Sequence, residues 1–398
     1  MINTEIMKWK GFFEMKSYAK NAKTVKNENR ALVLRHIRQK MVSRADICKK
    51  TGMPKSSVTR ITNELIEEGQ LLEIGVTDSS YGRKPILLDI VADYRYAAGI
   101  ALHRSSFYVC IVNLKSEILA YESYKIENGD DPYELLDRAY EQILRFLEEL
   151  NIPPQKCIGI GVSAPGPVEY VKGTILNPPD FKLFHHVEVG EYLRAKSGLP
   201  VMLDNNSVLN AMQEYATQPT SVFQNSMFVN IFGGIGSAVL TGGKVFRGIG
   251  GFSGEFGHTG IQPDGLPCPC GNVGCLECYV SLKALKKAYQ FESYEEMVDL
   301  AYEGDEKANE MLRFMAEKFS YAMVNAINLF DLDAIIFYGE YSYRPQRLAE
   351  LLQSHIEARA MVARAHDVKV IFSEMSPVLS RASVCTAIIN AYFEQKFN

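Results

Sequence analysis

One short segment of this sequence constrains the fold more than any other, because it brings a histidine and three cysteines together. His258 stands ten positions before Cys268, and Cys268, Cys270 and Cys275 follow one another as Cys-x-Cys-x4-Cys. These are the ligand types of a closed tetrahedral Cys3His zinc site. Glycines at 271 and 274 allow a short loop to fold back so that three thiolates converge. The spacing therefore predicts a structural zinc ion that pins this loop.

A disulfide is the main alternative for the same cysteines. Cys278 makes the local number of cysteines even, but Cys268 and Cys270 are too close to serve two bridges comfortably. The other cysteines, at 48, 110, 157 and 385, are scattered, as is usual in a reducing compartment. Zinc is favoured, and a disulfide or free thiols remain the alternatives.

Length and composition predict a soluble protein of several domains. A chain of 398 residues is too long for one ordinary core, so two or three domains are expected. Its hydrophobic share of 47% and charged share of 23% are those of globular proteins. No apolar run is long enough for a membrane helix, and the N-terminus lacks the pattern of a signal peptide. We therefore expect a cytoplasmic protein with no membrane partner.

The net charge of -4 hides a strong asymmetry along the chain. Residues 1–88 hold 17 Lys and Arg against 9 Asp and Glu, which leaves 26 against 38 in the remainder. A basic module on an acidic body is typical of a nucleic-acid-binding headpiece attached to a regulatory domain. A solvated lysine-rich tail is the alternative for residues 8–26, and we treat residues 1–28 as an N-terminal extension.

Residues 29–90 show the pattern of a winged helix-turn-helix domain. Apolar spacing predicts a first helix from about Asn29, and the capping box at Ser43 opens a second helix that runs to about residue 50. A tight turn at Gly52 precedes Pro54, where a third helix begins. Two short strands, at 71–74 and 85–88, flank a loop at 77–84 that has the character of a wing.

The third helix has one apolar face and one polar, cationic face. Val58, Ile61 and Leu65 share the buried side. Polar and cationic side chains opposite them are arranged as in a DNA recognition helix, and cations at the wing tip suit phosphates or a minor groove. The predicted DNA-binding residues are Lys55, Ser56, Ser57, Thr59, Arg60, Asn63, Arg83 and Lys84. A three-helix protein-interaction module is the alternative.

From residue 91 to 398 the pattern is that of an α/β domain. Strands are predicted at 96–102, 107–114, 157–162, 199–203 and 334–338, and helices at 135–150, 208–215 and 382–393. Residues 281–330 are predicted to be helical. A glycine-rich hairpin is predicted between residues 228 and 244. Polar side chains at 204–206 follow a strand, where ligands sit in open α/β sheets. Two glycine-rich halves suggest a duplicated fold around a cleft.

Together these motifs resemble the ROK family of repressors, open-reading-frame proteins and sugar kinases, in its transcriptional-repressor branch. The resemblance covers nearly the whole chain from Asn29 and includes Gly82-Arg83-Lys84-Pro85, the loop at 161–167, the segment at 254–258 and the cysteine cluster. It implies an actin-like, two-lobed, sugar-kinase-like domain behind the headpiece. It also implies a zinc ion and a sugar in the cleft. The implied zinc ligands are His258, Cys268, Cys270 and Cys275, and the implied sugar-binding residues are Asn205, Asn206, Glu255, His258 and Glu277.

The departures from the kinase pattern all concern ATP chemistry. Kinase members carry an aspartate base where this chain has Asn206, and an amide cannot accept a proton at neutral pH. The glycines that approach ATP phosphates are replaced by His103-Arg104-Ser105, and Gly339 is followed by Glu340, whose carboxylate would repel phosphate. The resemblance thus implies a sensor with no enzymatic activity.

The expected function is that of a sugar-responsive DNA-binding repressor of carbohydrate-metabolism genes. Its partners would be operator DNA and a sugar or sugar phosphate effector. A homodimer or homotetramer is expected, because helix-turn-helix proteins usually read two half-sites by symmetry. The alternatives are an ATP-dependent sugar kinase with a regulatory headpiece and a zinc-stapled protein-binding scaffold.

Overall fold

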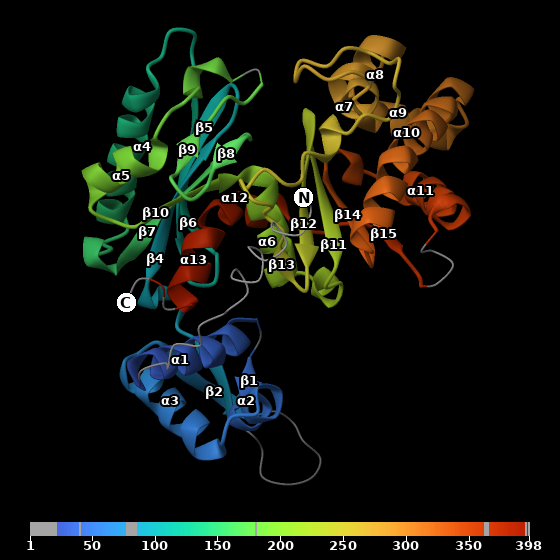
Figure 1. Cartoon of the computed structure of the whole chain (residues 1–398). Coiled ribbons are helices and arrows are strands. Elements are labelled where there is room, and N and C mark those ends of the chain that lie inside the picture. The colour runs from blue at the N-terminus through green and yellow to red at the C-terminus, as the bar shows by residue number, and fades with distance from the viewer. Residues whose placement is uncertain are drawn as a thin grey trace, which may run out of the picture. The chain divides into compact units, whose positions relative to one another are not determined.

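The computed structural model describes residues 22–39, 41–76, 86–179, 181–361, 366–394 and 396. The chain forms two compact units (Figure 1). One unit comprises Met1–Asp89 together with Phe393–Asn398, and the other comprises Ile90–Tyr392. None of the described helices is long and apolar enough to cross a membrane.

The smaller unit contains the three predicted helices. They are α1 (Ala22–Gln39), α2 (Arg44–Thr51) and α3 (Lys55–Glu67). Ser43 caps α2 with the predicted capping box, in which the side chains of Ser43 and Asp46 each accept a hydrogen bond from the other's backbone N–H. Gly52 ends α2 in the left-handed conformation at φ 70°, and Pro54 precedes α3. The helix α1 begins seven residues before the predicted start at Asn29. The sequence did not predict this first part of the helix, because its residues are mostly polar and show no apolar period.

A small three-stranded sheet, in the order β1-β3-β2, completes this unit. Its strands are β1 (Val42–Ser43), β2 (Leu71–Val76) and β3 (Ile86–Ile90). The predicted wing strands correspond to β2 and β3. The wing residues Arg83 and Lys84 lie outside the described residues. Val58, Ile61 and Leu65 of α3 are fully buried, as their spacing predicts.

The larger unit contains two five-stranded sheets (Figure 1). The first has the order β10-β7-β4-β5-β6 and the second has the order β13-β12-β11-β14-β15. The strands of the first are β4 (Tyr96–Leu102), β5 (Ser106–Asn113), β6 (Ile118–Lys125), β7 (Cys157–Ala164) and β10 (Val201–Asn205). Those of the second are β11 (Ser226–Phe232), β12 (Gly234–Thr241), β13 (Lys244–Val245), β14 (Ala334–Gly339) and β15 (Lys369–Phe372).

The two sheets share one topology. In each, the first three strands form an antiparallel meander, and two further strands then pair in parallel with its first strand and with each other. This is the duplicated α/β fold expected from the sequence, although the sequence alone does not show the repeat. We call the part of this unit built on the first sheet the first lobe and the part built on the second sheet the second lobe. A two-stranded sheet of β8 (Val168–Glu169) and β9 (Thr174–Ile175) accompanies the first lobe.

Each sheet packs against helices to form a separate apolar core. The first core includes β4, β5, β7 and the helices α4 (Pro132–Glu149) and α5 (Val189–Ser197). The second core joins the other sheet to α9 (Tyr294–Glu303), α10 (Glu306–Phe330) and α11 (Gln346–Arg359). The remaining α-helices are α6 (Asn206–Thr217), α7 (Glu277–Val280), α8 (Leu282–Tyr289), α12 (Pro377–Ala382) and α13 (Thr386–Phe393).

Two predicted helical regions are interrupted in the structure. Residues 281–330 are helical, as predicted, and they are divided into α8, α9 and α10. Gln290 ends α8 in the left-handed conformation, and Ser293 and Asp305 cap the next two helices. The helix at 382–393 likewise begins as α12 and passes through a 3-10 turn, Ser383–Cys385, before α13.

This 3-10 turn packs directly on the first sheet, where only a glycine fits. A Cβ atom on Gly161 of β7 would lie 2.0 Å from the carbonyl oxygen of Val384. Gly161 lies in β7 just before the loop that lines the cleft described below. The close approach therefore joins the C-terminal segment to the strand that supports the site.

Gly161→Ala should destabilise the larger unit by about 1–3 kcal/mol or more, because either β7 or the 3-10 turn must move to relieve the overlap. Urea unfolding should show a lowered midpoint. Gly260→Ala is the matched control, since its Cβ would meet nothing closer than the carbonyl oxygen of Val273 at 3.5 Å. Equal midpoints for the two variants would contradict the steric argument.

Candidate functional site

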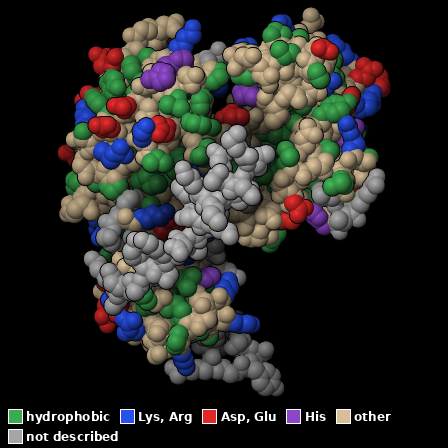
Figure 2. Space-filling view, viewed as in Figure 1, with side chains coloured by type: hydrophobic (Ala, Val, Ile, Leu, Met, Phe, Trp, Pro, Cys, Tyr) green, Lys and Arg blue, Asp and Glu red, His purple; other side chains and the backbone are tan. Residues whose placement is uncertain are grey.

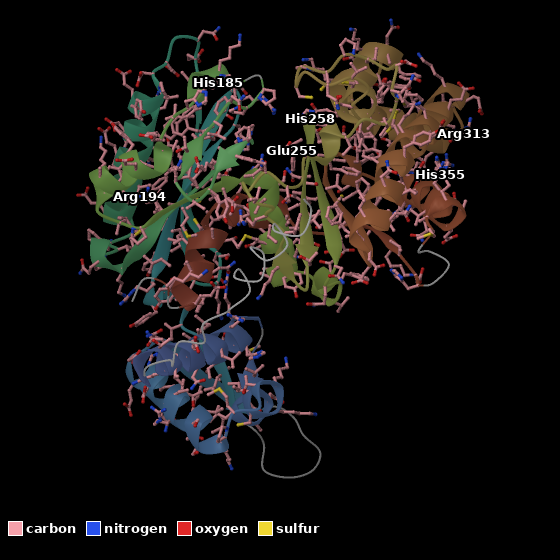
Figure 3. The ribbon with its side chains drawn as sticks, viewed as in Figure 1. His185, Arg194, Glu255, His258, Arg313 and His355 are labelled. Atoms are coloured by element: carbon pink, nitrogen blue, oxygen red, sulfur yellow. The ribbon has the colours of Figure 1, made fainter. Side chains whose placement is uncertain are left out.

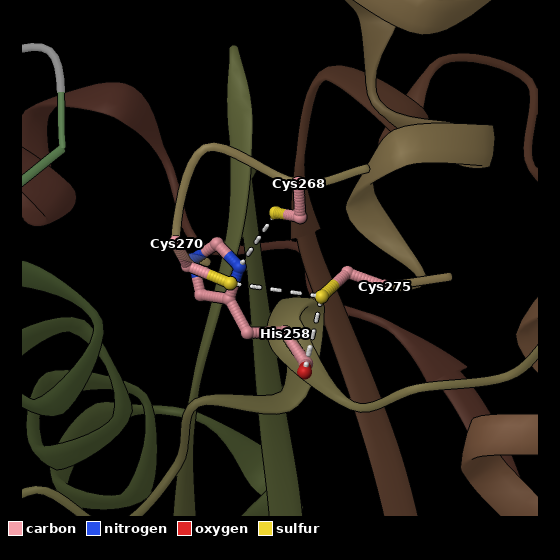
Figure 4. Close-up of side chains that lie close together, drawn as sticks. All are labelled: His258, Cys268, Cys270 and Cys275. Carbon is pink, nitrogen blue, oxygen red and sulfur yellow. Dashed lines mark hydrogen bonds between the residues drawn. The ribbon is translucent and has the colours of Figure 1, made fainter. Parts of the chain in front are cut away.

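The structure brings His258 and the three cysteines together at one point of the second lobe (Figure 4). One ligand atom from each of His258, Cys268, Cys270 and Cys275 lies within 4.8 Å of all the others. The Nδ1 atom of His258 is 3.5 Å from the Sγ atom of Cys268, and the Sγ atoms of Cys270 and Cys275 are 3.7 Å apart. These four residues could hold one metal ion.

Backbone hydrogen bonds within the cysteine loop hold it in a folded-back conformation. The backbone N–H of Cys268 donates to the carbonyl of Asn272 at 2.9 Å, and that of Gly271 donates to the carbonyl of Cys268 at 3.0 Å. Gly274 has φ +70°, and a Cβ atom there would lie 1.8 Å from the carbonyl oxygen of Gln262. Glycine is therefore required at 274 for both reasons.

The chemistry of the four donors suits a divalent metal ion better than a disulfide. All eight cysteines of the chain lie in described segments, and each is unbridged. Burial, followed by the neighbouring sulfurs of Cys268 and Cys270, raises the pKa of Cys275 to about 12. A divalent cation among the sulfurs would favour their thiolate forms, because it supplies the opposite charge.

A cleft of about 630 Å³ lies between the two lobes of this unit, beside the cysteine cluster (Figure 2). Its volume is in the range of small-molecule sites, about 300–1,000 Å³. The structure brings all five predicted sugar-binding residues to its wall. They are Asn205, Asn206, Glu255, His258 and Glu277. Glu255 and His258 belong to the second lobe, and Figure 3 shows them on the side of the cleft opposite His185.

Asn205 presents an amide donor to the cleft. It caps α6, and its side-chain Oδ1 accepts a hydrogen bond from the backbone N–H of Ser207 at 2.8 Å. The Nδ2 group consequently turns toward Gly166, where a Cβ atom would lie only 2.3 Å from it. Asn206, the next residue, opens α6 and also lines the cleft.

Glu255 is placed by the glycine before it. Gly254 has φ +98°, and a Cβ atom there would lie 2.4 Å from the carbonyl oxygen of Ser237. The carbonyl of Gly254 accepts hydrogen bonds from the backbone N–H and the hydroxyl of Ser237. The Glu255 side chain faces the open cleft, yet the surrounding walls displace water and raise its pKa; nearby Glu277 acts in the same direction and His258 opposes it.

The Glu277 carboxylate is held by the backbone at the start of β12. Its Oε2 atom accepts a hydrogen bond from the backbone N–H of Ile235 at 2.7 Å. A Cβ atom on Gly234 would lie 2.8 Å from the same oxygen, so a glycine at 234 makes room for the carboxylate. Glu277 also follows the cluster residue Cys275 by two positions, which ties the carboxylate to the cysteine loop.

His258 belongs to both the cluster and the cleft. Its Nδ1 atom faces the Cys268 sulfur, so the other ring nitrogen, Nε2, is available to a ligand. A metal ion on Nδ1 would leave the proton on Nε2, which then acts as a donor. The carboxylates can accept from hydroxyl groups, and Asn205 and His258 can donate to them. This arrangement is suited to a polyhydroxylated ligand.

Several cleft residues were not predicted from the sequence. Arg104, Lys182 and His185 line the first lobe's wall, and Phe232 and Phe252 add apolar surface on the other side. In the sequence Arg104 stands out only as a departure from the kinase pattern. No local motif marks Lys182 or His185, because they lie in a segment with no regular period.

The exposed face of α3 carries most of the predicted DNA-binding side chains. Lys55, Ser56, Arg60 and Asn63 are exposed, and Ser57 and Thr59 are partly buried. Arg60 forms an ion pair with Glu64 at 3.0 Å, and Asn63 accepts a hydrogen bond from Arg44 at 3.0 Å. Exposed pairs of this kind contribute little stability, so Arg60 can exchange its partner at little cost.

Comparisons with known proteins agree with both units. The profile of the ROK family matches residues 97–379, and that of the IclR helix-turn-helix domain matches residues 32–73. The chain is 29% identical over 390 residues to the xylose repressor of Caldicellulosiruptor bescii, with 93% of this chain and 97% of the relative covered.

Solved structures show the same fold. The chain matches a ROK family transcriptional regulator, described as a homologue of the Escherichia coli MLC protein, with a TM-score of 0.78 and 24% identity. That match covers 94% of this chain and 98% of the other. A ROK hexokinase from Thermus thermophilus matches with a TM-score of 0.63 and 22% identity, over 76% of this chain and all of the hexokinase.

Cys270→Ser should lower metal affinity by at least about 10–100-fold, because it removes one donor of the four, and even outer partners of metal ligands contribute this much. Metal content of the purified protein, measured by emission spectroscopy after dialysis against a chelator, should fall. Cys278→Ser is the matched control, since Cys278 is a neighbouring thiol outside the group of four. Equal retention in both variants would contradict the assigned ligand set.

Proposed function

The chain belongs to the ROK family, and we propose that it is a sugar-responsive DNA-binding transcriptional repressor of carbohydrate-metabolism genes. The observation that carries this proposal is that one chain combines a helix-turn-helix unit with a cleft suited to sugar hydroxyls. The relative from Caldicellulosiruptor bescii is named a xylose repressor, which supports the same role.

The headpiece would bind operator DNA through α3. Arg60 and Asn63 are long enough and polar enough to reach base edges, and Lys55 and Ser56 at the start of the helix would contact base edges or phosphates. Arg83 and Lys84 would contact the backbone or minor groove. A homodimer or homotetramer would present two such helices to two half-sites.

The metal ion would be zinc. Three sulfur donors and one imidazole are the ligand types of a structural zinc site, and these four residues would hold the ion. Zinc would supply no step of chemistry here. It would hold the cysteine loop and the orientation of His258, and through them the position of Glu277.

We further propose that the cleft has no kinase activity. Asn206 occupies the place of the catalytic aspartate and cannot take a proton from a sugar hydroxyl. Glu340 Oε2 accepts a hydrogen bond from the backbone N–H of Gly233 at 3.1 Å, so this donor is already engaged by a carboxylate. Burial raises the pKa of Glu340. The alternative, a kinase with a regulatory headpiece, is consistent with the fold but not with these residues.

Asn206→Asp should not restore phosphorylation of a bound sugar, because the restored base would still lack a phosphate site beside Glu340. A coupled assay with ATP should show no turnover for the native protein or the variant. Turnover of about 1 per second or more, in the range of ordinary enzymes, would contradict the proposal.

The sugar should lower the affinity of the protein for its operator. A ligand held by Asn205 on one lobe and by Glu255 and Glu277 on the other favours the closed cleft, since only closure satisfies both sets of hydrogen bonds. The chain joins the two units at Asp89 and again at Phe393. Closure in both subunits would change the spacing of the paired α3 helices, and a misplaced helix loses its base contacts.

The test is an operator titration with and without the best-binding sugar. We expect a decrease in operator affinity of about 5–150-fold, which corresponds to a coupling of about 1–3 kcal/mol. Glu255→Ala should remove this effect and leave sugar-free operator binding near normal. An unchanged operator Kd at saturating sugar would contradict the proposal, and a lower Kd would make the sugar a co-repressor.

A further inference from the structure

The cleft has a cationic wall opposite its carboxylates. Arg104, Lys182 and His185 come from the first lobe, and Glu255 and Glu277 come from the second. Glu255 and Glu277 are the only carboxylate side chains among the described residues that line the cleft. Within the described segments neither Arg104 nor Lys182 forms an ion pair. The site is therefore charged at both ends, with opposite signs.

The segment that carries Lys182 and His185 is anchored by two phenylalanines. Phe181 and Phe184 are buried and stacked, with ring centroids 4.9 Å apart. In a 3-10 turn, side chains three residues apart lie on the same side. Lys182 and His185 are also three residues apart, the first in the turn Lys182–Phe184 and the second directly after it. Both side chains are exposed at the cleft.

Backbone pairing closes this segment at its base. Ile175 and Val187 form an antiparallel bridge, and the backbone N–H of His186 donates to the carbonyl of Leu176 at 2.6 Å. Lys182 and His185 thus stand on a short, closed loop whose apolar side belongs to the core of the first lobe. The backbone that carries them is anchored by this core and by the bridge at its base.

Arg104 and His185 are each oriented by a carbonyl of this same loop. The Nε–H of Arg104 donates to the carbonyl of Pro179 at 3.3 Å, which leaves the two terminal NH2 groups of the guanidinium for a ligand. The Nε2 atom of His185 lies 3.1 Å from the carbonyl of Pro178. Because a carbonyl only accepts, Nε2 must carry a proton, and in the neutral ring Nδ1 is an acceptor that can take a hydrogen bond from a ligand hydroxyl.

We propose that the effector is a monosaccharide that carries an anionic group, with a phosphate ester as the best match. Its hydroxyls would contact Glu255, His258 and Glu277, and its anion would lie against Arg104 and Lys182. This inference rests on the proposed function of the cleft as a sugar site. A neutral sugar would leave the cationic wall without a partner, whereas a guanidinium with free terminal groups can bind phosphate in a bidentate manner.

A phosphate and a carboxylate could both provide the negative charge, so the test must separate a sugar phosphate from a sugar acid. The full chain is titrated calorimetrically with glucose, xylose and N-acetylglucosamine. It is also titrated with the ester of each sugar that carries a phosphate on the terminal hydroxyl, and with glucuronate. The best phosphate should bind about 10–100-fold more tightly than its neutral parent, the gain typical of hydrogen bonds to charged groups. That gain should shrink at high salt.

Variants then locate the anion. Arg104→Gln and Lys182→Gln should each remove most of the gain for the phosphate and leave the affinity for the neutral sugar unchanged. Lys172→Gln, an exposed cation of the same lobe outside the cleft, is the control and should change neither affinity. Tight binding of glucuronate that also depends on Arg104 would support the anionic site and assign a sugar acid to it.

Failure of this inference differs from failure of the proposed function. Equal affinities for neutral and phosphorylated sugars, unaffected by Arg104→Gln, would overturn the anionic site and leave the sugar sensor intact. If neither a neutral nor a phosphorylated sugar binds, and Glu255→Ala does not change the response of operator affinity to added sugar, the proposed function itself fails.

Discussion

The convergence of His258 with three cysteine sulfurs is the constraint on which the rest of the site depends. One nitrogen of His258 faces the sulfurs, and the ring also lines the cleft. Glu277 follows directly after the cysteine loop, and its carboxylate is held by the backbone of β12. A metal ion bound at the cluster would therefore stabilise the second-lobe wall of the cleft as well as the loop. Ligand recognition and metal binding are expected to fail together, although no catalytic role is needed for either.

Steric limits on the backbone place the other groups of the cleft. Gly166, Gly234 and Gly254 each stand where a side chain would strike Asn205, Glu277 or the backbone of Ser237. These close approaches bring donors and carboxylates from two lobes to one cavity. We propose that the residues that would serve ATP in a kinase are altered in the same region. Asn206 lacks a basic carboxylate, and Glu340 occupies the backbone N–H of Gly233. On our proposal the fold of a sugar kinase serves as a sensor, because residues suited to sugar hydroxyls remain where the residues for phosphoryl transfer are altered.

The sequence predicted features that depend on local spacing, and it missed those that depend on distant contacts. The cysteine cluster and the capping box at Ser43 are local patterns, and both are present in the structure. The region 281–330 is helical as predicted, but its division into three helices was not predicted, because capping at Ser293 and Asp305 competes with a continuous apolar period. The strands β6 and β15 and the helix α11 were missed. Lys182 and His185 gave no signal, since their place at the cleft follows from the burial of Phe181 and Phe184. The sugar-binding assignments came from family resemblance and stay predictions.

We propose that the cleft and the headpiece are energetically coupled. Coupling between two binding sites is reciprocal, so operator DNA must change sugar affinity by the same factor as sugar changes operator affinity. The most direct measurement is a calorimetric titration of the best-binding sugar into the free protein and into the protein saturated with operator. We expect the operator to weaken sugar binding by about 5–150-fold, equal to the factor found in the opposite titration. Identical sugar affinities in the two titrations would contradict it.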